Sequence, residues 1–499
     1  MKPTSVVFGP PGTGKTTELL KIVDRLLSSG IQSHRVGFMA FTRKGASEAA
    51  NRAMDKFSLL RTDLPFFRTI HSAALALAPV MREQIIRRFQ LAEFAEEQGL
   101  EFTGVSDMEV QAGYVPAGDV VRFLENLSRL KGLPLNVVWS DNPEMDVPLG
   151  MLVSFANTYR SYKMSAGLID FTDILLSYLR DGTVPALEVM IIDEAQDLSD
   201  LQWRVVEKMA SNCKEIIVAG DDDQAIYGWS GASTSQFLDM AASVKDVRVL
   251  RKSFRVPRKV HDIALRISRQ IGTRVEKNWT PRDAEGSVSE VSSVEDLELS
   301  RGTWLVLARN QYALNEVEEL CLLNGYNYKS RKFDSAKSSA GTAIRTYRAL
   351  MDGKDVSLGD LLTLAEMTGA SGMKRQFSNV HRGVRFTAAD VRALKEPDLK
   401  FTSWQDELKL MSPDDVRFYT TMEHHEPVAN SARVTLSTIH GSKGGECQNV
   451  ALLTEMSRRT AQNLEDDPDE EHRVFYVGVT RTSQNLVLVD SNTKHFYEI

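Results

Sequence analysis

The sequence predicts an α/β protein with two parallel sheets, in which each core carries a mainly helical insertion. Short apolar runs typical of strands buried on both faces alternate with helical stretches, and they form two groups, before and after about residue 250. The segments from about 73 to 160 and from about 333 to 430 contain no such run and have mainly helical patterns. We therefore expect two α/β cores with one helical insertion in each.

The apolar runs that we expect to form strands are short and mostly rich in Val and Ile. In the first group they span residues 5–8, 35–40, 189–192 and 215–219, and in the second group 304–308, 434–437, 450–453 and 486–489. A helical pattern over residues 15–27 follows the first run after a Gly-rich turn. Strands separated by helices are typical of parallel sheets, because a parallel connection needs a crossover.

The composition is that of a soluble globular protein, with 42% hydrophobic and 25% charged residues. No apolar run approaches the roughly 18 residues that span a bilayer, and the N-terminal residues leave no room for a signal peptide. The three cysteines, Cys213, Cys321 and Cys447, lie far apart and match no metal-binding spacing. We therefore expect free thiols, no membrane association and a reducing cytoplasm.

The net charge of −7 does not by itself predict a polyanionic partner. Basic residues nevertheless gather in two stretches, 248–282 and 374–395, and each is either a nucleic-acid contact or a solvated basic face. An acidic run over residues 465–471 is predicted to be an exposed loop.

A phosphate-binding loop follows the first predicted strand and precedes the first predicted helix. Its glycines let backbone N–H groups turn toward phosphates, and the helix N-terminus adds partial positive charge. Lysine supplies a full charge to the β and γ phosphates, and the threonine hydroxyl is a ligand for Mg²⁺. The loop consists of Gly9, Pro10, Pro11, Gly12, Thr13, Gly14, Lys15 and Thr16.

Acidic and basic residues at later strand ends complete a nucleoside-triphosphatase pattern. Asp193 and Glu194 end an apolar run, where Asp193 is suited to Mg²⁺ and Glu194 to activating water. Gln224 follows the next strand and is within reach of the γ-phosphate. Arg255 and Arg481 come from the second group, so either is a candidate arginine finger acting across a cleft. Taken singly, the acidic pair is as often a solvated strand end, and an arginine is more often a surface residue.

The order of these segments resembles that of the UvrD/Rep/PcrA-type superfamily 1 helicases. Nine stretches carry the resemblance, namely residues 9–17, 38–44, 68–71, 167–171, 193–197, 220–232, 253–255, 437–446 and 476–481. They cover both cores, whereas the two insertions resemble the family only in position. The resemblance implies two RecA-like motor domains, each with a mainly helical insertion.

The domain limits implied by the resemblance divide the chain into four parts. The first RecA-like motor domain would comprise residues 1–72 and 161–250, with its insertion at 73–160. The second would comprise 251–332 and 431–499, with a short insertion at 333–430.

The resemblance also implies roles for individual residues. ATP would be contacted by the phosphate loop with Thr17 and by Asp193, Glu194, Gln224, Arg255, Arg481 and Glu446, with Phe254 stacked on adenine. Single-stranded DNA would be contacted by Phe41, Thr42, Thr69, His71, Tyr227, Trp229, Thr438 and His440. Aromatic residues suit this task because they stack on any base. The alternatives are a core tryptophan at Trp229 and structural histidines at positions 71 and 440.

From the resemblance we expect a helicase that uses ATP and Mg²⁺, moves 3′ to 5′ on single-stranded DNA and separates tailed duplexes. It would act in replication or repair, in a bacterial or phage-infected host cytoplasm. A loading or single-strand-binding protein partner is not identified by the sequence. The alternatives are a translocase that displaces proteins with weak unwinding, and an inactive DNA-binding scaffold. Three departures from the family pattern bear on this. Eight residues precede Gly9, so we expect no upstream segment that reads adenine, and therefore weaker nucleotide selectivity. Ser230 stands where the family usually has arginine. The second insertion is short. No nuclease domain or partner-binding tail is expected after Ile499.

Overall fold

The computed structural model describes residues 3–103, 115–369, 383–393, 399–490 and 493–499. Its contacts divide the chain into two compact units. The first comprises residues 1–286 and 457–483 with the terminal Ile499, and the second comprises residues 287–456 and 484–498. The four-part division expected from the sequence therefore differs from these units in where residues 251–286 and 457–483 belong, and it stays a prediction.

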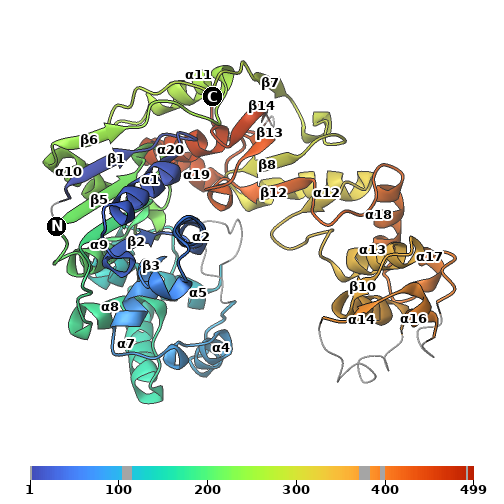
Figure 1. Ribbon diagram of the computed structural model, residues 1–499, viewed down its shortest axis with the longest axis horizontal. Coiled ribbons are helices and arrows are strands. Elements are labelled where there is room, and N and C mark those ends of the chain that lie inside the picture. Colours follow the sequence, from blue (N-terminus) through green and yellow to red (C-terminus); the bar gives the residue numbers. More distant parts are fainter. Residues whose placement is uncertain (1–2, 104–114, 370–382, 394–398, 491–492) are drawn as a thin grey trace. The chain divides into compact units, whose positions relative to one another are not determined.

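The first unit is built on a six-stranded parallel sheet with the order β3-β2-β4-β5-β1-β6 (Figure 1). Its strands are β1 (Ser5–Phe8), β2 (Val36–Ala40), β3 (Phe67–Thr69), β4 (Val189–Ile192), β5 (Glu215–Gly220) and β6 (Asp246–Val249). Each predicted run of the first group is a strand, and β3 and β6 are strands that the sequence patterns did not indicate.

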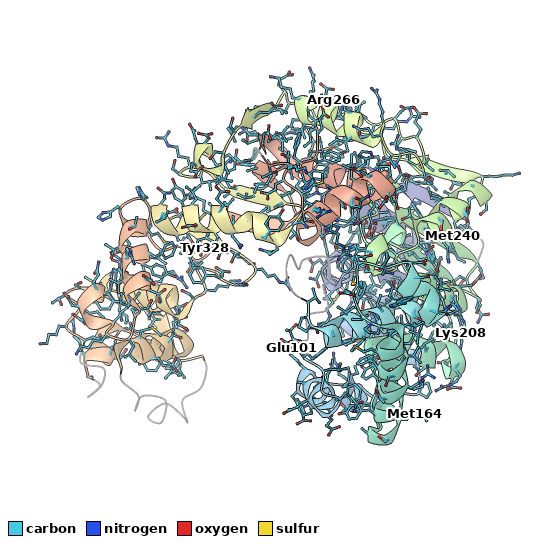
Figure 2. All side chains as sticks on the ribbon, turned by 180° about the vertical axis from the view of Figure 1, so that it is seen from behind. Glu101, Met164, Lys208, Met240, Arg266 and Tyr328 are labelled. Atoms are coloured by element: carbon cyan, nitrogen blue, oxygen red, sulfur yellow. The ribbon has the colours of Figure 1, made fainter. Side chains whose placement is uncertain are left out.

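Helices cover both faces of this sheet. Val6 and Phe8 of β1 pack into one apolar cluster with α3, α8, α9 and α10, whereas Val7 packs into another with α1 and α2. Such two-sided burial explains why the strands are continuous apolar runs. The helices that cover the sheet are α1 (Lys15–Ser28), α2 (Arg43–Phe57), α3 (Ile70–Leu77), α8 (Phe171–Asp181), α9 (Asp200–Met209) and α10 (Thr234–Ser243). The first unit also contains α11 (Arg258–Ser268), α19 (Arg458–Asp466) and α20 (Pro468–Val479), and α20 packs on the other two. Side chains also join neighbouring helices: Lys208 of α9 donates to two carbonyl oxygens near the end of α8 (Figure 2).

The insertion of the first unit is helical, as predicted. It has its own apolar core, in which Phe155 stacks on Tyr159 and the Phe94 ring contacts both at larger angles. Its helices are α4 (Arg88–Glu97), α5 (Ala117–Lys131), α6 (Leu135–Ser140) and α7 (Leu149–Ala166).

The second unit contains another six-stranded sheet, with the order β7-β14-β13-β8-β12-β9. Strand β8 pairs in parallel with β12 and β13, and β7 pairs in parallel with β14. The strands are β7 (Ser287–Val291), β8 (Trp304–Ala308), β9 (Tyr328–Lys329), β12 (Val434–Thr438), β13 (Cys447–Leu453) and β14 (Thr482–Val489). The fold class predicted from the sequence, two parallel-sheet α/β cores of RecA-like type, is confirmed.

The insertion of the second unit is mainly helical, with one small antiparallel ladder. Its helices are α13 (Ser339–Met351), α14 (Leu358–Thr368), α16 (Ala388–Arg392), α17 (Trp404–Glu407) and α18 (Pro413–Glu423). Helix α12 (Leu314–Asn324) precedes the insertion and belongs to the sheet core. The ladder pairs β10 (Val356–Ser357) with β11 (Arg385–Phe386). Four residues of the second basic stretch, at positions 374, 375, 382 and 395, lie outside the described residues. Of the other two, Arg385 pairs with Asp355, and Arg392 stands over the Phe401 ring.

The acidic run at residues 465–471 is not an exposed loop, and that prediction was wrong. It ends α19 and supplies the first turn of α20, where Pro468 is at the start of the helix. Acidic side chains stabilise a helix N-terminus because the free N–H groups there carry partial positive charge. Asp469 also accepts hydrogen bonds from the backbone N–H groups of Gly272 and Thr273.

Among the residues that the structure describes, no helix is both long and apolar enough to cross a membrane. All three cysteines are free thiols, as the sequence predicted.

Candidate nucleotide and nucleic-acid site

The predicted phosphate loop joins the end of β1 to the start of α1. Gly12 and Gly14 have φ angles of 70° and 79°, a left-handed conformation that favours glycine. Gly14 is the N-cap of α1 and offers no side chain to the N–H groups of the first helical turn. A side chain at Gly12 would also collide with Arg255, because an added Cβ would lie 2.4 Å from the Arg255 Cβ. The loop therefore needs glycine at this position both for its backbone and for its packing.

The Lys15 ammonium lies between the two carboxylates that end β4. Its Nζ is 2.6 Å from Glu194 Oε2 and 3.4 Å from Asp193 Oδ1. Burial disfavours the charged lysine, but Glu194 and Asp193 outweigh it and raise the pKa of Lys15 above its usual value. Burial also raises the pKa of Asp193, although Lys15 opposes that shift. A buried carboxylate of this kind is stabilised by a further cation.

Glu194 has a backbone conformation that is unusual for its residue type. Its φ of 56° is left-handed, which costs a non-glycine residue about 1–2 kcal/mol. The conformation turns the Glu194 carboxylate back toward Lys15 and toward Gln196, whose Nε2 donates to Glu194 Oε2 at 2.7 Å. Strain of this order is typical of active sites, and the catalytic role of Glu194 stays a prediction.

A chain of polar contacts leads from these carboxylates to the residues after β5. The side chain of Gln196 is fully buried, and its Oε1 accepts a hydrogen bond from the Asp221 N–H at 3.0 Å. The Asp221 carboxylate accepts from Gln224 Nε2 at 2.6 Å. Arg481 then donates to Gln224 Oε1 at 3.0 Å. The geometry thus brings together Glu194, Gln224 and Arg481, which the sequence placed at distant positions.

The segment 253–255 packs directly on the phosphate loop. The Ser253 hydroxyl donates to the Pro11 carbonyl, and the Phe254 N–H donates to the Gly12 carbonyl, each at 2.8 Å. The Phe254 ring is 73% exposed and lies close to Gly14. A large exposed ring held beside a phosphate loop is a surface on which a base can stack.

Arg255 and Arg481 both belong to the first unit, together with the phosphate loop. The sequence predicted that they would come from the second core. The first unit includes them because the segment 253–255 packs on the phosphate loop and α11 packs on α20. Their assignment to a second motor domain stays a prediction. Their roles toward a nucleotide stay predictions.

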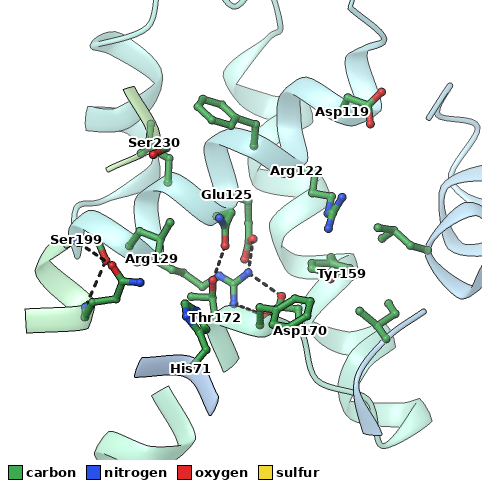
Figure 3. A pocket seen from close by; sticks show the side chains of 18 of the residues that line it. His71, Asp119, Arg122, Glu125, Arg129, Tyr159, Asp170, Thr172, Ser199 and Ser230 are labelled. Atoms are coloured by element: carbon green, nitrogen blue, oxygen red, sulfur yellow. Dashed lines mark hydrogen bonds and ion pairs between the residues drawn. The ribbon is translucent and has the colours of Figure 1, made fainter. Parts of the chain in front are cut away.

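A cavity of about 500 Å³ lies between the helical insertion and the core of the first unit (Figure 3). Its aromatic lining includes Phe41, His71 and Trp229, three of the residues predicted to touch DNA, together with Phe123 of α5. Trp229 and Phe123 are nearly parallel, with ring centroids 6.2 Å apart. Phe41 stacks on Tyr227 at 5.5 Å. Trp229 is half-buried, and its indole N–H is buried without a hydrogen-bond partner among the residues that the structure describes.

An ion network forms part of the lining of this cavity. Arg129 of α5 donates to Asp170 and Glu125 (Figure 3). It also donates to Asp173. Lys163 of α7 pairs with the same two aspartates. Burial works against the Asp170 carboxylate, but Arg129 and Lys163 outweigh it and hold its pKa below the usual range. Two cations of the insertion therefore fix the start of α8, which belongs to the core.

The remaining residues predicted to touch DNA in the first unit have local structural roles as well. Thr42 and Thr69 are the N-caps of α2 and α3 and accept from the N–H groups of Gly45 and Ser72. Burial lowers the pKa of His71 to about 4, so its imidazole is neutral at physiological pH.

Three predicted residues lie in the second unit. Thr438 ends β12 and accepts from the Gly441 N–H, and His440 begins the short helical turn that follows. Glu446 immediately precedes β13. They share the carboxyl end of one strand and the loop after it, as expected of residues close in sequence.

Sequence reasoning missed residues whose role depends on long-range packing. Phe123 and Arg122 line the cavity from the insertion, and Gln196 links the two motifs. A Phe within an amphipathic helix gives no signal that distinguishes it from a core residue. Gln196 lies within the motif at 193–197, but nothing in the sequence indicated its own role.

The fold and the loop define the class of the protein: two RecA-like cores of which the first carries a phosphate loop. The sequence-family model of the UvrD/REP helicase N-terminal domain matches residues 1–245. The family model of the UvrD-like helicase C-terminal domain matches residues 414–493. The chain therefore belongs to the UvrD/Rep helicase family.

Known relatives are similar over most of this chain at low identity. DNA helicase II of Escherichia coli is 22% identical over 80% of the chain, which covers 58% of that protein. A probable DNA helicase II homolog of Rickettsia conorii is 21% identical over 98% of the chain and 90% of that protein. The ATP-dependent DNA helicase PcrA of Leuconostoc citreum is 21% identical over 99% of the chain and 80% of that protein.

Proposed function

We propose that the protein is a DNA-dependent ATPase that moves 3′ to 5′ along single-stranded DNA and separates duplex. One observation carries the proposal: a continuous series of polar contacts runs from Lys15 and Glu194 through Gln196 and Asp221 to Gln224. Three residues after Gln224, Tyr227 stacks on Phe41 at the aromatic cavity. The short segment 224–227 thus joins the predicted phosphate site to the predicted base-stacking surface.

The contact between Lys15 and Glu194 suggests how nucleotide binding would prepare hydrolysis. The γ-phosphate would attract Lys15 away from Glu194, because a phosphate carries more negative charge than one carboxylate. The Glu194 carboxylate would then accept the proton of a water molecule. The water oxygen forms a bond to the γ-phosphorus as the bond to the bridging β–γ oxygen breaks, and Lys15, Arg255 and Arg481 would stabilise the charge on the phosphoryl oxygens.

The residues present also fit a magnesium ion. Thr16 is the second residue of α1, and Asp193 is a buried carboxylate whose raised pKa marks a need for positive charge. Hydroxyl and carboxylate oxygens are the ligands that Mg²⁺ prefers. When bound, the ion would neutralise charge on the phosphates.

The names of the relatives support DNA as the substrate, since both DNA helicase II and PcrA are described as DNA helicases. The direction of movement rests on the resemblance of residues 220–232 to the corresponding family motif. Stacking aromatics support single strands, because bases in a duplex do not expose their faces.

The test is unwinding of duplexes with one single-stranded tail, with ATP and Mg²⁺. We expect 3′-tailed duplexes to be separated and 5′-tailed ones to persist. Separation of only 5′-tailed duplexes would overturn the direction. Displacement of a protein block from single-stranded DNA without any unwinding would favour the translocase instead.

A further inference from the structure

Three consecutive aspartates, Asp221, Asp222 and Asp223, follow β5, and none of their side chains is exposed to solvent. Three carboxylates in one buried turn repel one another, and each loses its hydration. The turn is therefore stable only if cations are supplied from elsewhere in the chain.

Two residues of the basic stretch at 248–282 turn inward to supply this charge. Lys277 Nζ lies within 3.3 Å of all three carboxylates, and its side chain is fully buried. Arg274 makes a bidentate pair with Asp223, at 2.8 and 2.6 Å. The backbone reinforces the arrangement, because the Val275 N–H donates to the Asp222 carboxylate at 2.8 Å.

Lys277 also contacts the strand that leads into the phosphate loop. Its Nζ is 5.5 Å from the centroid of the Phe8 ring, which is within cation–π range. Phe8 is the last residue of β1, and the next residue, Gly9, donates its N–H to the carbonyl of Gly220 at the end of β5. Lys277 thus bridges the two strand ends at which the nucleotide residues begin.

The turn sets the orientation of Gln224. A carboxylate only accepts hydrogen bonds and a guanidinium only donates them. The Gln224 amide therefore satisfies both Asp221 and Arg481 in one orientation, with its NH₂ toward Asp221 and its oxygen toward Arg481. Loss of the cation beside Asp221 would leave the carboxylates uncompensated and move the acceptor that holds the amide.

We propose that Lys277 is a positioning residue for nucleotide hydrolysis, which neutralises the aspartate turn and thereby holds Gln224 in its working orientation. The inference rests on the proposed ATPase function. Lys277 does not touch the nucleotide in this scheme, and it acts through Asp221 and Gln224.

The test is a double-mutant cycle on kcat and KM for ATP with saturating single-stranded DNA. Lys277→Met should lower kcat by about 10- to 100-fold, because small misplacements of catalytic groups have effects of this order. KM should change less than about threefold, because Lys15 and the loop are intact. In a Gln224→Ala background, the same substitution should lower kcat by less than about threefold, since residues acting through one another are not additive. Lys214→Met, which removes an exposed lysine paired with Glu188, is the matched control.

The outcomes separate this inference from the proposed function. A wild-type protein that hydrolyses no ATP would overturn both. A hydrolysing wild type with an unchanged kcat in Lys277→Met, or with fully additive losses in the cycle, would overturn the positioning role alone.

Removing one member of a buried ion cluster can prevent folding. In that event the charge-balanced variant Lys277→Met/Asp222→Asn replaces the single one. We expect it to fold, because one cation and one anion are removed together. Its kcat should still lie at least about tenfold below wild type, because Asp221 loses the cation at 3.3 Å while Arg274 remains paired with Asp223. A folded double variant with wild-type kcat would refute the role of Lys277.

Discussion

Replacing Trp229 by alanine should weaken the binding of single-stranded DNA without abolishing basal ATP hydrolysis. Trp229 stacks on Phe123 with ring centroids 6.2 Å apart, lines the cavity and is half-buried. A base stacked on an aromatic side chain is worth about 1–3 kcal/mol by alanine substitution. At 1.4 kcal/mol for each factor of ten, the dissociation constant should rise about 5- to 140-fold.

The assay is fluorescence anisotropy of a labelled oligothymidylate at fixed salt, because phosphate contacts make the affinity salt-dependent. Phe123→Ala should weaken binding in the same direction. Phe89→Ala is the matched control, since Phe89 is an exposed aromatic residue of the same insertion that does not line the cavity. A change of less than about twofold for folded Trp229→Ala would refute base stacking there. Unfolding of the variant would instead identify Trp229 as a core residue.

Three further predictions follow from the same geometry. Glu194→Gln keeps the shape of the side chain but removes the base, so ATP should bind and persist in single-turnover experiments; near-normal turnover would exclude water activation by Glu194. Arg129→Met leaves Glu125, Asp170 and Asp173 with less compensating charge and should lower the free energy of unfolding by about 3–5 kcal/mol; a loss below about 1 kcal/mol in urea denaturation would contradict the network's role. The pKa of His71 is lowered to about 4 in the fold, against about 6.5 when exposed, so the unfolded chain binds the extra proton between these values and stability rises with pH across that window. His71→Gln should therefore reduce the difference in melting temperature between pH 5 and pH 7.5, and an unchanged difference would show that another group is responsible.

The sequence predicted the strands best where both faces of a strand are buried. The runs that became β1, β4, β5 and β8 are almost entirely apolar because nearly all of their side chains are buried, so these positions favour apolar residues. Strand β6 was missed because most of its side chains are exposed at the sheet edge, and its Asp and Arg hide the pattern. The acidic run was misassigned because a helix N-terminus and a solvated loop favour the same residues.

The phosphate loop and the motif carboxylates could be identified from local spacing alone. The partners of the aspartate turn could not, because nothing in the sequence near residue 277 indicates that its lysine is buried rather than solvated. Phe123 was invisible for a similar reason: a base-stacking ring and a core ring occupy the same position of an amphipathic helix. Residues of this kind are defined by tertiary packing, which brings positions more than 50 residues apart into contact.

The central claim is that a nucleotide site and a DNA site are connected through Gln224. The most direct measurement is the rate of ATP hydrolysis by the wild-type protein and by Gln224→Ala, each with and without single-stranded DNA. We predict that DNA strongly stimulates the wild-type protein and that Gln224→Ala binds DNA normally but loses the stimulation. Equal stimulation of both proteins would contradict the connection.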